Sequence, residues 1–235
     1  DVDLEEVARS MPGRSGADLN NLVNEAALMA AKEGKEEVGR EDFSRARDQI
    51  LMGQQRSGIV LRGREKHAIA VHEAGHALVA HLEPEADPVE KVSIIPRGRG
   101  LGATQQLPEE RYNFTADYLR ARLKVMLSGR ASESAVLGSI STGAADDLSQ
   151  ATRLARRMVS QWGMSEKFHH VAFQDSGTDV FLGEQIAQQR EYSEETAREI
   201  DLEVKALIDE CYKDALNILQ ENQDRLKHIA EVLEE

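Results

Sequence analysis

Residues 70–82, AVHEAGHALVAHL, hold two histidines four residues apart, with a glutamate directly after the first. On an α-helix, positions i and i+4 lie one turn apart on the same face, so His72 and His76 can reach one ion together. Imidazole nitrogen is a preferred ligand of Zn²⁺. Glu73 lies beside that face, where its carboxylate can take a proton from a zinc-activated water and later deliver it to the leaving amine. This H-E-x-x-H spacing predicts the zinc site of a peptidase.

The same spacing could belong to an ordinary amphipathic helix whose histidines find hydrogen-bond partners in a core. Two details favour the metal. Gly75 lies inside the expected helix, where glycine costs about 1 kcal/mol relative to alanine, which is easier to understand if another group must approach closely. The flanking residues Ala74, Ala77 and Ala80 are also small. We therefore expect a metal site.

A catalytic zinc needs a third protein ligand and an open position. Acidic residues between positions 83 and 90 lie in the loop after the helix and at the start of the next expected strand. Glu133, Asp146 and Asp147 are candidates farther along the chain. Asp146 and Asp147 stand at an expected helix start, where acidic residues are also favoured simply by the helix dipole. Spacing alone leaves all three open.

These residues need a scaffold, and apolar periodicity predicts a mainly α-helical one with a small β element. Ser15 and Asp18 resemble a capping box at the start of a helix that ends at Gly34. A polar, glycine-flanked stretch at 53–58 is the expected linker. Further helices are expected at about 40–51, from 59 to 82, from 115 onward, over 149–162, and as one or two helices from 193 to 235. Two short strands are expected at 89–96 and 102–107.

Composition excludes several classes of function. The net charge of −13 over 235 residues argues against binding nucleic acid or an anionic membrane. The single cysteine, Cys211, cannot form an internal disulfide and is expected on a buried helix face, which fits a reducing compartment. No apolar run approaches the roughly 20 residues that span a bilayer. The chain begins without methionine, as a piece of a longer protein would.

The glycine-rich stretch PRGRGLGATQQ is only a weak match to a nucleotide-binding loop. Gly98, Gly100 and Gly102 give G-x-G-x-G, but no helix follows to hold a pyrophosphate, so a loop between two strands explains the glycines. No G-x-x-x-x-G-K-[ST] occurs in the sequence. We therefore expect that this chain cannot hydrolyse ATP by itself.

Two long stretches, HEAGHALVAHL and STGAADDLSQATRLARRMVSQWGMS, resemble the FtsH family of membrane-anchored AAA proteases. The resemblance covers essentially the whole chain. PGRSGADLNNLVNEAALMAA is similar to the end of that family's AAA module, its small helical lid. VSIIPRGRGLGATQQLPEE and YSEETAREID are similar to its peptidase domain. The resemblance implies a lid portion plus linker at 1–56 and a helical zinc-peptidase domain at 57–235.

The resemblance also implies roles at the site. The family's third zinc ligand is a carboxylate just past the S-T-G-A turn, which corresponds to Asp147, with one zinc ion per subunit. Glu133 corresponds to a glutamate near the site, expected to orient a histidine ligand. Ser134 departs from the family's usual second glutamate there, and Arg14 from a more usual phenylalanine. The strand expected to line the cleft and pair with an extended substrate contains Gly100, Leu101, Gly102, Ala103 and Thr104.

The function implied is that of a zinc metalloendopeptidase domain within an ATP-dependent protease that degrades unfolded or misassembled proteins. Its partners would be protein and peptide substrates and identical subunits in a hexamer. ATP and Mg²⁺ would bind in an upstream core, and membrane helices would also lie upstream of Asp1. The location implied is the cytoplasmic side of a bacterial inner membrane or an organelle membrane, with this piece itself soluble. Two rivals are a non-catalytic assembly module that keeps the zinc helix, and an interaction module with buried histidines.

Overall fold

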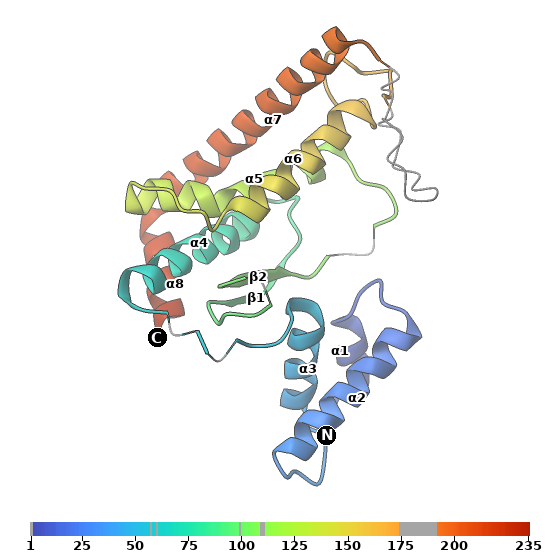
Figure 1. Ribbon diagram of the computed structural model, residues 1–235, viewed down its shortest axis with the longest axis vertical. Coiled ribbons are helices and arrows are strands. Elements are labelled where there is room, and N and C mark those ends of the chain that lie inside the picture. The colour runs from blue at the N-terminus through green and yellow to red at the C-terminus, as the bar shows by residue number, and fades with distance from the viewer. Residues whose placement is uncertain (1, 57, 60, 99, 109–110, 174–191) are drawn as a thin grey trace, which may run out of the picture.

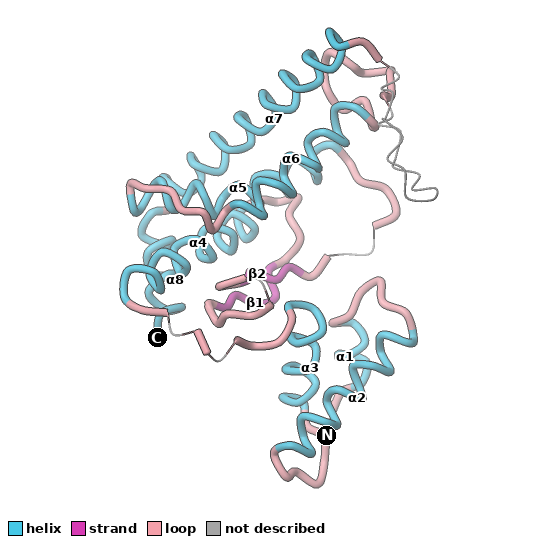
Figure 2. The backbone as a smooth tube through the Cα atoms, viewed as in Figure 1, coloured by secondary structure: helices cyan, strands magenta, loops and turns pink. Residues whose placement is uncertain are grey.

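The computed structural model describes residues 2–56, 58–59, 61–98, 100–108, 111–173 and 192–235 (Figure 1). Helices make up most of the described chain, and the sheet has two strands (Figure 2), so the expected mainly α fold with a small β element is confirmed. The helices are α1 (Leu4–Arg9), α2 (Gly16–Lys32), α3 (Arg40–Met52), α4 (Gly63–Leu82), α5 (Ala116–Ser132), the π-helix η1 (Glu133–Leu137), α6 (Ala145–Ser160), α7 (Glu194–Glu221) and α8 (Gln223–Glu234). The strands are β1 (Val89–Ser93) and β2 (Ala103–Gln106).

The first three helices form a small unit around their own apolar core, at the blue end of the chain in Figure 1. The expected capping box is present at the start of α2, where Ser15 and Asp18 bond each other's backbone N–H groups. Leu22, Ala26 and Ala30 of α2 are buried, whereas Val23 is 49% exposed. The periodicity did not predict α1, because its six residues are too few to show a helical period.

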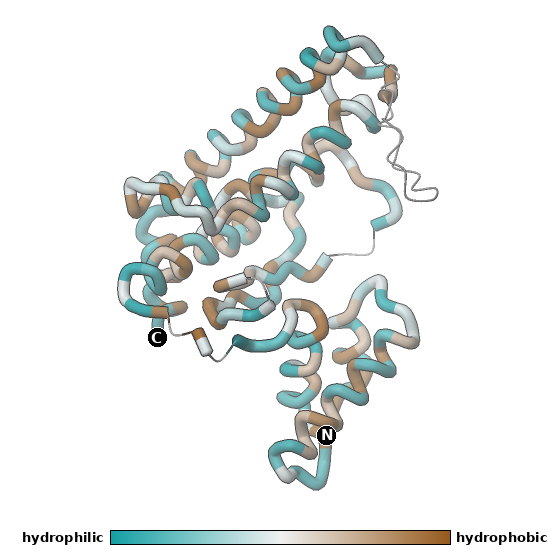
Figure 3. The backbone as a smooth tube through the Cα atoms, in the orientation of Figure 1, coloured by the Kyte–Doolittle hydropathy of each residue, from teal (hydrophilic) through white to brown (hydrophobic). Residues whose placement is uncertain are grey.

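The remaining helices enclose two further cores. One lies between α5, α6 and α7, and the other lies between α4, α5, α8 and the end of α7. Figure 3 shows apolar residues recurring along α7, and the buried stripe of that helix contributes to both cores. Ile200, Val204 and Cys211 lie in the first core and Leu219 lies in the second. Cys211 is fully buried, as expected from its setting.

Helix α4 is central to this arrangement. Every residue from Ala70 to Ala80 is buried, because α5, α8 and β1 all pack against this half of the helix. A helix covered on all sides has no polar face, so its hydrophobic pattern carries little amphipathic signal. The expectation that this helix begins at 59 is wrong. Gly63 has a φ of 43°, outside the right-handed helical region, so no helix runs through it from the N-terminal side.

The crossing of α4 and α5 is unusually close at Gly75. A Cβ built on Gly75 would lie 2.7 Å from the Ser128 carbonyl oxygen and 2.5 Å from the Ser132 hydroxyl oxygen. Ser132 donates a hydrogen bond back across the crossing to the Val71 carbonyl oxygen at 2.9 Å. The close approach expected from a glycine inside this helix is therefore confirmed, and the approaching group is α5.

The two strands form an antiparallel pair in which Val92 lies opposite Thr104. The pair is attached to the first unit through α3. Buried Asp48 forms ion pairs with Lys91 on β1 and with Arg97 in the loop between the strands, and the Arg56 N–H donates to the Pro96 carbonyl. Within the described residues, β2 pairs with β1 alone, so its other edge remains open.

None of the helices in the described ranges combines the length and the apolar character that crossing a membrane requires.

Gly75→Ala should lower the thermal unfolding midpoint of the protein by a few degrees. Alanine's better helix propensity would stabilise α4 by about 1 kcal/mol, but overpacking at a tight contact typically costs about 1–3 kcal/mol. The second effect should win, because the nearest obstacle includes the backbone carbonyl of Ser128, which cannot move without α5. Calorimetry or circular dichroism would measure the midpoint.

Gly16→Ala is the matched control, since Gly16 also lies in a helix but its added Cβ would meet no atom within 4 Å. We expect its midpoint to be unchanged or slightly raised. An equal or higher midpoint for Gly75→Ala would contradict the steric account of the crossing.

Candidate metal centre

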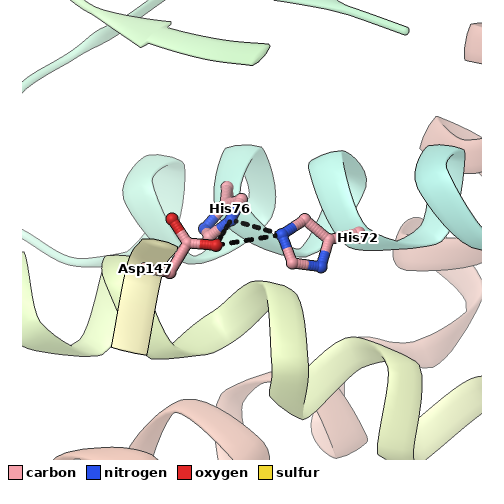
Figure 4. A group of neighbouring side chains, drawn as sticks. All are labelled: His72, His76 and Asp147. Atoms are coloured by element: carbon pink, nitrogen blue, oxygen red, sulfur yellow. Dashed lines mark hydrogen bonds and ion pairs between the residues drawn. The ribbon is translucent and has the colours of Figure 1, made fainter. Parts of the chain in front are cut away.

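Three side chains from two helices converge on one point, as Figure 4 shows. His72 and His76 lie one turn apart on α4, and Asp147 lies in the first turn of α6. The two Nε2 atoms are 3.1 Å apart, and Asp147 Oδ2 is 3.2 Å from His72 Nε2 and 3.6 Å from His76 Nε2. In the part of the chain that the structure describes, this is the one group of three or more potential ligand residues close enough to share an ion.

The spacing of these atoms fits a zinc ion. Bonds of about 2.0–2.2 Å at tetrahedral angles place neighbouring ligand atoms about 3.3–3.6 Å apart. The three observed separations, from 3.1 to 3.6 Å, are close to that range. Two histidines and one carboxylate also match the donor set of catalytic rather than structural zinc sites, which leave a fourth position open.

Hydrogen bonds on the far side of each imidazole fix which nitrogen faces the site. His72 Nδ1 lies 2.7 Å from Glu133 Oε1, and His76 Nδ1 lies 2.7 Å from the Val125 carbonyl oxygen. A carbonyl and an ionised carboxylate only accept, so both Nδ1 atoms donate. Each neutral imidazole then presents a lone pair at Nε2. These two lone pairs and the Asp147 carboxylate oxygen are all acceptors and lie 3.1 to 3.6 Å from one another, so a cation between them would satisfy all three.

In the metal-free protein, a proton can take that place. Burial alone would lower the pKa of His72, but hydrogen bonds to Asp147 and Glu133 outweigh burial and raise it. Burial alone would raise the pKa of Asp147, but hydrogen bonds from His72 and His76 hold it well below its usual range. Asp147 is therefore ionised at neutral pH, as a metal ligand must be.

Glu133 is positioned by the segment that leads into α6. It begins the π-helix η1, directly after α5, and is almost fully buried. The Ser141 backbone N–H donates to Glu133 Oε2 at 2.6 Å, and the Ser141 hydroxyl donates to Oε1 at 3.0 Å. Ser141 thus connects the S-T-G-A turn to the Glu133 carboxylate, which in turn holds His72. In the sequence, the turn and the segment around Glu133 are separate motifs.

Glu73 lies on α4 beside the two histidines and is only 6% exposed. Thr104 on β2 donates to its Oε2 at 2.7 Å. Burial raises the pKa of Glu73 above its ordinary value, and the neighbouring His76 and the Thr104 hydrogen bond only partly offset this. A carboxylate with a raised pKa suits proton transfer near neutral pH.

Sequence reasoning missed Gly129 of α5. A Cβ at this position would lie 2.5 Å from His72 Nε2 and 2.6 Å from His76 Nε2. Any side chain here would therefore occupy the space at the nitrogens that face the site. The sequence does contain a signal for this close contact. Gly129 lies in the interior of an expected helix, as Gly75 does, and a glycine there often marks a close approach.

The other candidates for the third ligand lie outside the cluster of His72, His76 and Asp147, and Glu133 contacts only the Nδ1 side of His72. Asp146 is exposed and accepts a hydrogen bond from Gln150. Of the acidic residues between 83 and 90, Glu83 pairs with Lys124 and Asp87 accepts from the Tyr118 hydroxyl.

The glycine-rich loop and β2 lie near Glu73. A Cβ at Gly102 would lie 2.6 Å from Glu73 Oε1. Ala103 and Thr104 also line a cavity of about 320 Å³ that is bounded on the other side by Met11, Leu51 and other residues of the first unit.

Comparison with known proteins agrees with this geometry. The sequence model of peptidase family M41 matches residues 59–235, and that of the AAA+ lid domain matches residues 1–45. "ATP-dependent zinc metalloprotease FtsH" of Nitrosococcus oceani is 52% identical over 234 residues, which cover 99% of this chain and 36% of that protein. "ATP-dependent zinc metalloprotease FtsH 2" of Salinibacter ruber is 46% identical over 234 residues, with 99% and 34% covered.

The chain thus spans about a third of the length of the curated relatives that it matches. The resemblance to the FtsH family that the motifs indicated is confirmed over the whole chain. A family model that covers most of the chain and relatives at about half identity leave no ambiguity: the chain belongs to peptidase family M41, and an AAA+ lid precedes its peptidase domain.

Proposed function

We propose that this chain is the zinc-dependent endopeptidase part of an ATP-dependent protease, with His72, His76 and Asp147 as the zinc ligands and Glu73 as the general base. The convergence of the three ligand atoms beside a buried carboxylate carries the proposal. The names of the relatives, which are zinc metalloproteases, support it. We place the boundary between the lid with its linker and the peptidase domain at 56/57.

Zinc bound here would polarise the substrate carbonyl and lower the pKa of water from about 15.7 to about 7. The chain's own residues supply the rest. Glu73 takes a proton from the attacking water and delivers it to the amine of the departing peptide. Glu133 and the Val125 carbonyl hold the two imidazoles with Nε2 toward the site, so little reorganisation is needed.

The open edge of β2 is the proposed place for substrate. An extended peptide adding to this edge would be held through its backbone, which suits an enzyme that accepts many sequences. Gly100, Leu101, Gly102, Ala103 and Thr104 would line this cleft. The cavity between β2 and the first unit offers space for a substrate side chain beside Thr104.

We further propose that this part works within a longer, membrane-anchored, hexameric protein whose ATPase core binds ATP and Mg²⁺ and feeds unfolded or misassembled proteins to the peptidase. The match to an AAA+ lid and the "ATP-dependent" names of relatives about three times as long support this. For a bacterial source, the cytoplasmic face of the inner membrane would be the location, and for a eukaryotic source an organelle membrane.

Asp147→Ala should weaken zinc binding by at least about 100-fold, because it removes one of three protein ligands. Zinc content after dialysis and competition with a chromophoric chelator would measure the affinity. Asp146→Ala is the matched control: the neighbouring carboxylate is exposed and outside the cluster, so this variant should bind zinc like the wild type. Equal affinity in both variants would rule out Asp147 as a ligand.

Glu73→Gln should retain zinc but lose at least about 100-fold in the rate of casein cleavage, because the amide cannot take up the proton. Casein digestion with zinc present, and zinc content measured on the same samples, would test this. Equal digestion by wild type and variant would show that Glu73 is not the base. Zinc bound by a wild type that cleaves nothing would instead favour a non-catalytic assembly module.

The stabilisation that zinc gives should grow as pH rises through the ordinary histidine pKa of 6.5 and then through the raised pKa of His72. The pKa of His72 is raised in the metal-free fold, so the proton on His72 stabilises that fold. This stabilisation is fully present below the ordinary histidine pKa of 6.5 and is lost as pH rises through the raised pKa of His72. Zinc must displace this proton at low pH and meets none at high pH. The unfolding midpoint with zinc minus that without would measure the gain, and a gain that falls with rising pH would contradict the assignment.

A further inference from the structure

The Glu73 carboxylate is held by a strand rather than by its own helix. Thr104 Oγ1 lies 2.7 Å from Glu73 Oε2 and 3.2 Å from the Glu73 backbone oxygen. Both neighbours accept, so the hydroxyl is the donor, and its single proton favours the closer, charged oxygen. Among the described residues, Thr104 is the one side chain that hydrogen-bonds this carboxylate.

The second oxygen of Glu73 lies against the same strand. A Cβ at Gly102 would come within 2.6 Å of Oε1 and 2.8 Å of the Glu73 Cγ. Residues two apart in an extended segment face the same way, so Gly102 and Thr104 both face α4. Gly102 leaves room for the carboxylate, and Thr104 anchors it.

The position of Thr104 is itself fixed by β1 and, through β1, by α3. Thr104 lies opposite Val92 on β1, and the neighbouring Lys91 forms an ion pair with buried Asp48 on α3. A glutamate side chain has several rotatable bonds, and a carboxylate that must meet a water in one orientation gains from a rigid anchor.

We propose that Thr104 is a positioning residue for the reaction: its hydroxyl holds Glu73 Oε2, which leaves Oε1 as the oxygen that takes the proton from the attacking water. This inference rests on the proposed function, since it matters for catalysis only if Glu73 is the base. It goes beyond the expectation that Thr104 merely lines the substrate cleft.

Thr104→Val keeps the shape of the side chain and removes the hydroxyl, whereas Thr104→Ser keeps the hydroxyl. With the zinc-loaded chain and a fluorogenic peptide, Thr104→Val should lower kcat about 10- to 100-fold, as expected for loss of a hydrogen bond to a charged group. KM should change less than about threefold, zinc content should stay the same, and Thr104→Ser should restore most of kcat. Thr152→Val, at an exposed threonine of α6, is the matched control and should behave as the wild type.

A second measurement needs no activity. In the metal-free protein, Thr104→Val should lower the unfolding midpoint in the wild-type background and lower it much less in the Glu73→Ala background. That difference reports the coupling between the two side chains.

The outcomes separate the two proposals. If Glu73→Gln cleaves as well as the wild type, or if the zinc-loaded wild type cleaves nothing, the proposed function fails, and the midpoint measurement still decides whether Thr104 holds Glu73. If Glu73→Gln is inactive while Thr104→Val keeps full kcat, only the role of Thr104 is overturned. Four other results would also overturn the role of Thr104. In the Thr104→Val variant these are an effect on KM alone or a loss of bound zinc. The others are a Thr104→Ser variant that does not restore kcat, and equal midpoint shifts in the wild-type and Glu73→Ala backgrounds.

Discussion

The close crossing of α4 and α5 is the constraint on which the site depends. At one point Gly75 on α4 admits the backbone of α5, and at another Gly129 on α5 admits the two imidazoles of α4. The same α5 supplies the Val125 carbonyl that holds His76 and leads directly into Glu133, which holds His72. A helix pair separated by ordinary side chains would place these partners too far away. The candidate metal centre is therefore a product of backbone proximity as much as of residue identity.

Around this crossing, each side chain of the candidate site is fixed by a different part of the chain. His72 depends on the turn at Ser141, His76 depends on α5, and Glu73 depends on β2. Asp147 comes from α6, which packs on α5 and α7. The five polar side chains of the site, His72, Glu73, His76, Glu133 and Asp147, all have hydrogen-bond partners, as a low-dielectric site requires. The small β element, minor in the fold, thus contributes directly to the chemistry.

Much of this could be predicted from the sequence, for identifiable reasons. The H-E-x-x-H pattern places two histidines on one helical face whatever surrounds them. The N-capping residues Ser15 and Thr115 mark where α2 and α5 begin. The third ligand could not be derived from spacing, since Glu133, Asp146 and Asp147 fit equally, and the choice came from resemblance. The contacts of Gly129 and Thr104 with the site depend on how distant segments pack, which no local pattern records. The start of α4 was misplaced because an apolar run at 59–61 lies just before the helix, and the sequence does not show that Gly63 adopts a φ of 43°.

The long helix α7 contributes buried residues to both cores of the peptidase part, while the three N-terminal helices surround a separate core. Loss of either peptidase core would strip partners from the same helix, so the two should open together as one cooperative unit. Among the described residues, the N-terminal unit shares no core residue with them, and ion pairs and backbone hydrogen bonds join it to β1 and the loop between the strands. Amide hydrogens of the first three helices should accordingly exchange through a lower-energy opening that leaves the cluster of His72, His76 and Asp147 intact.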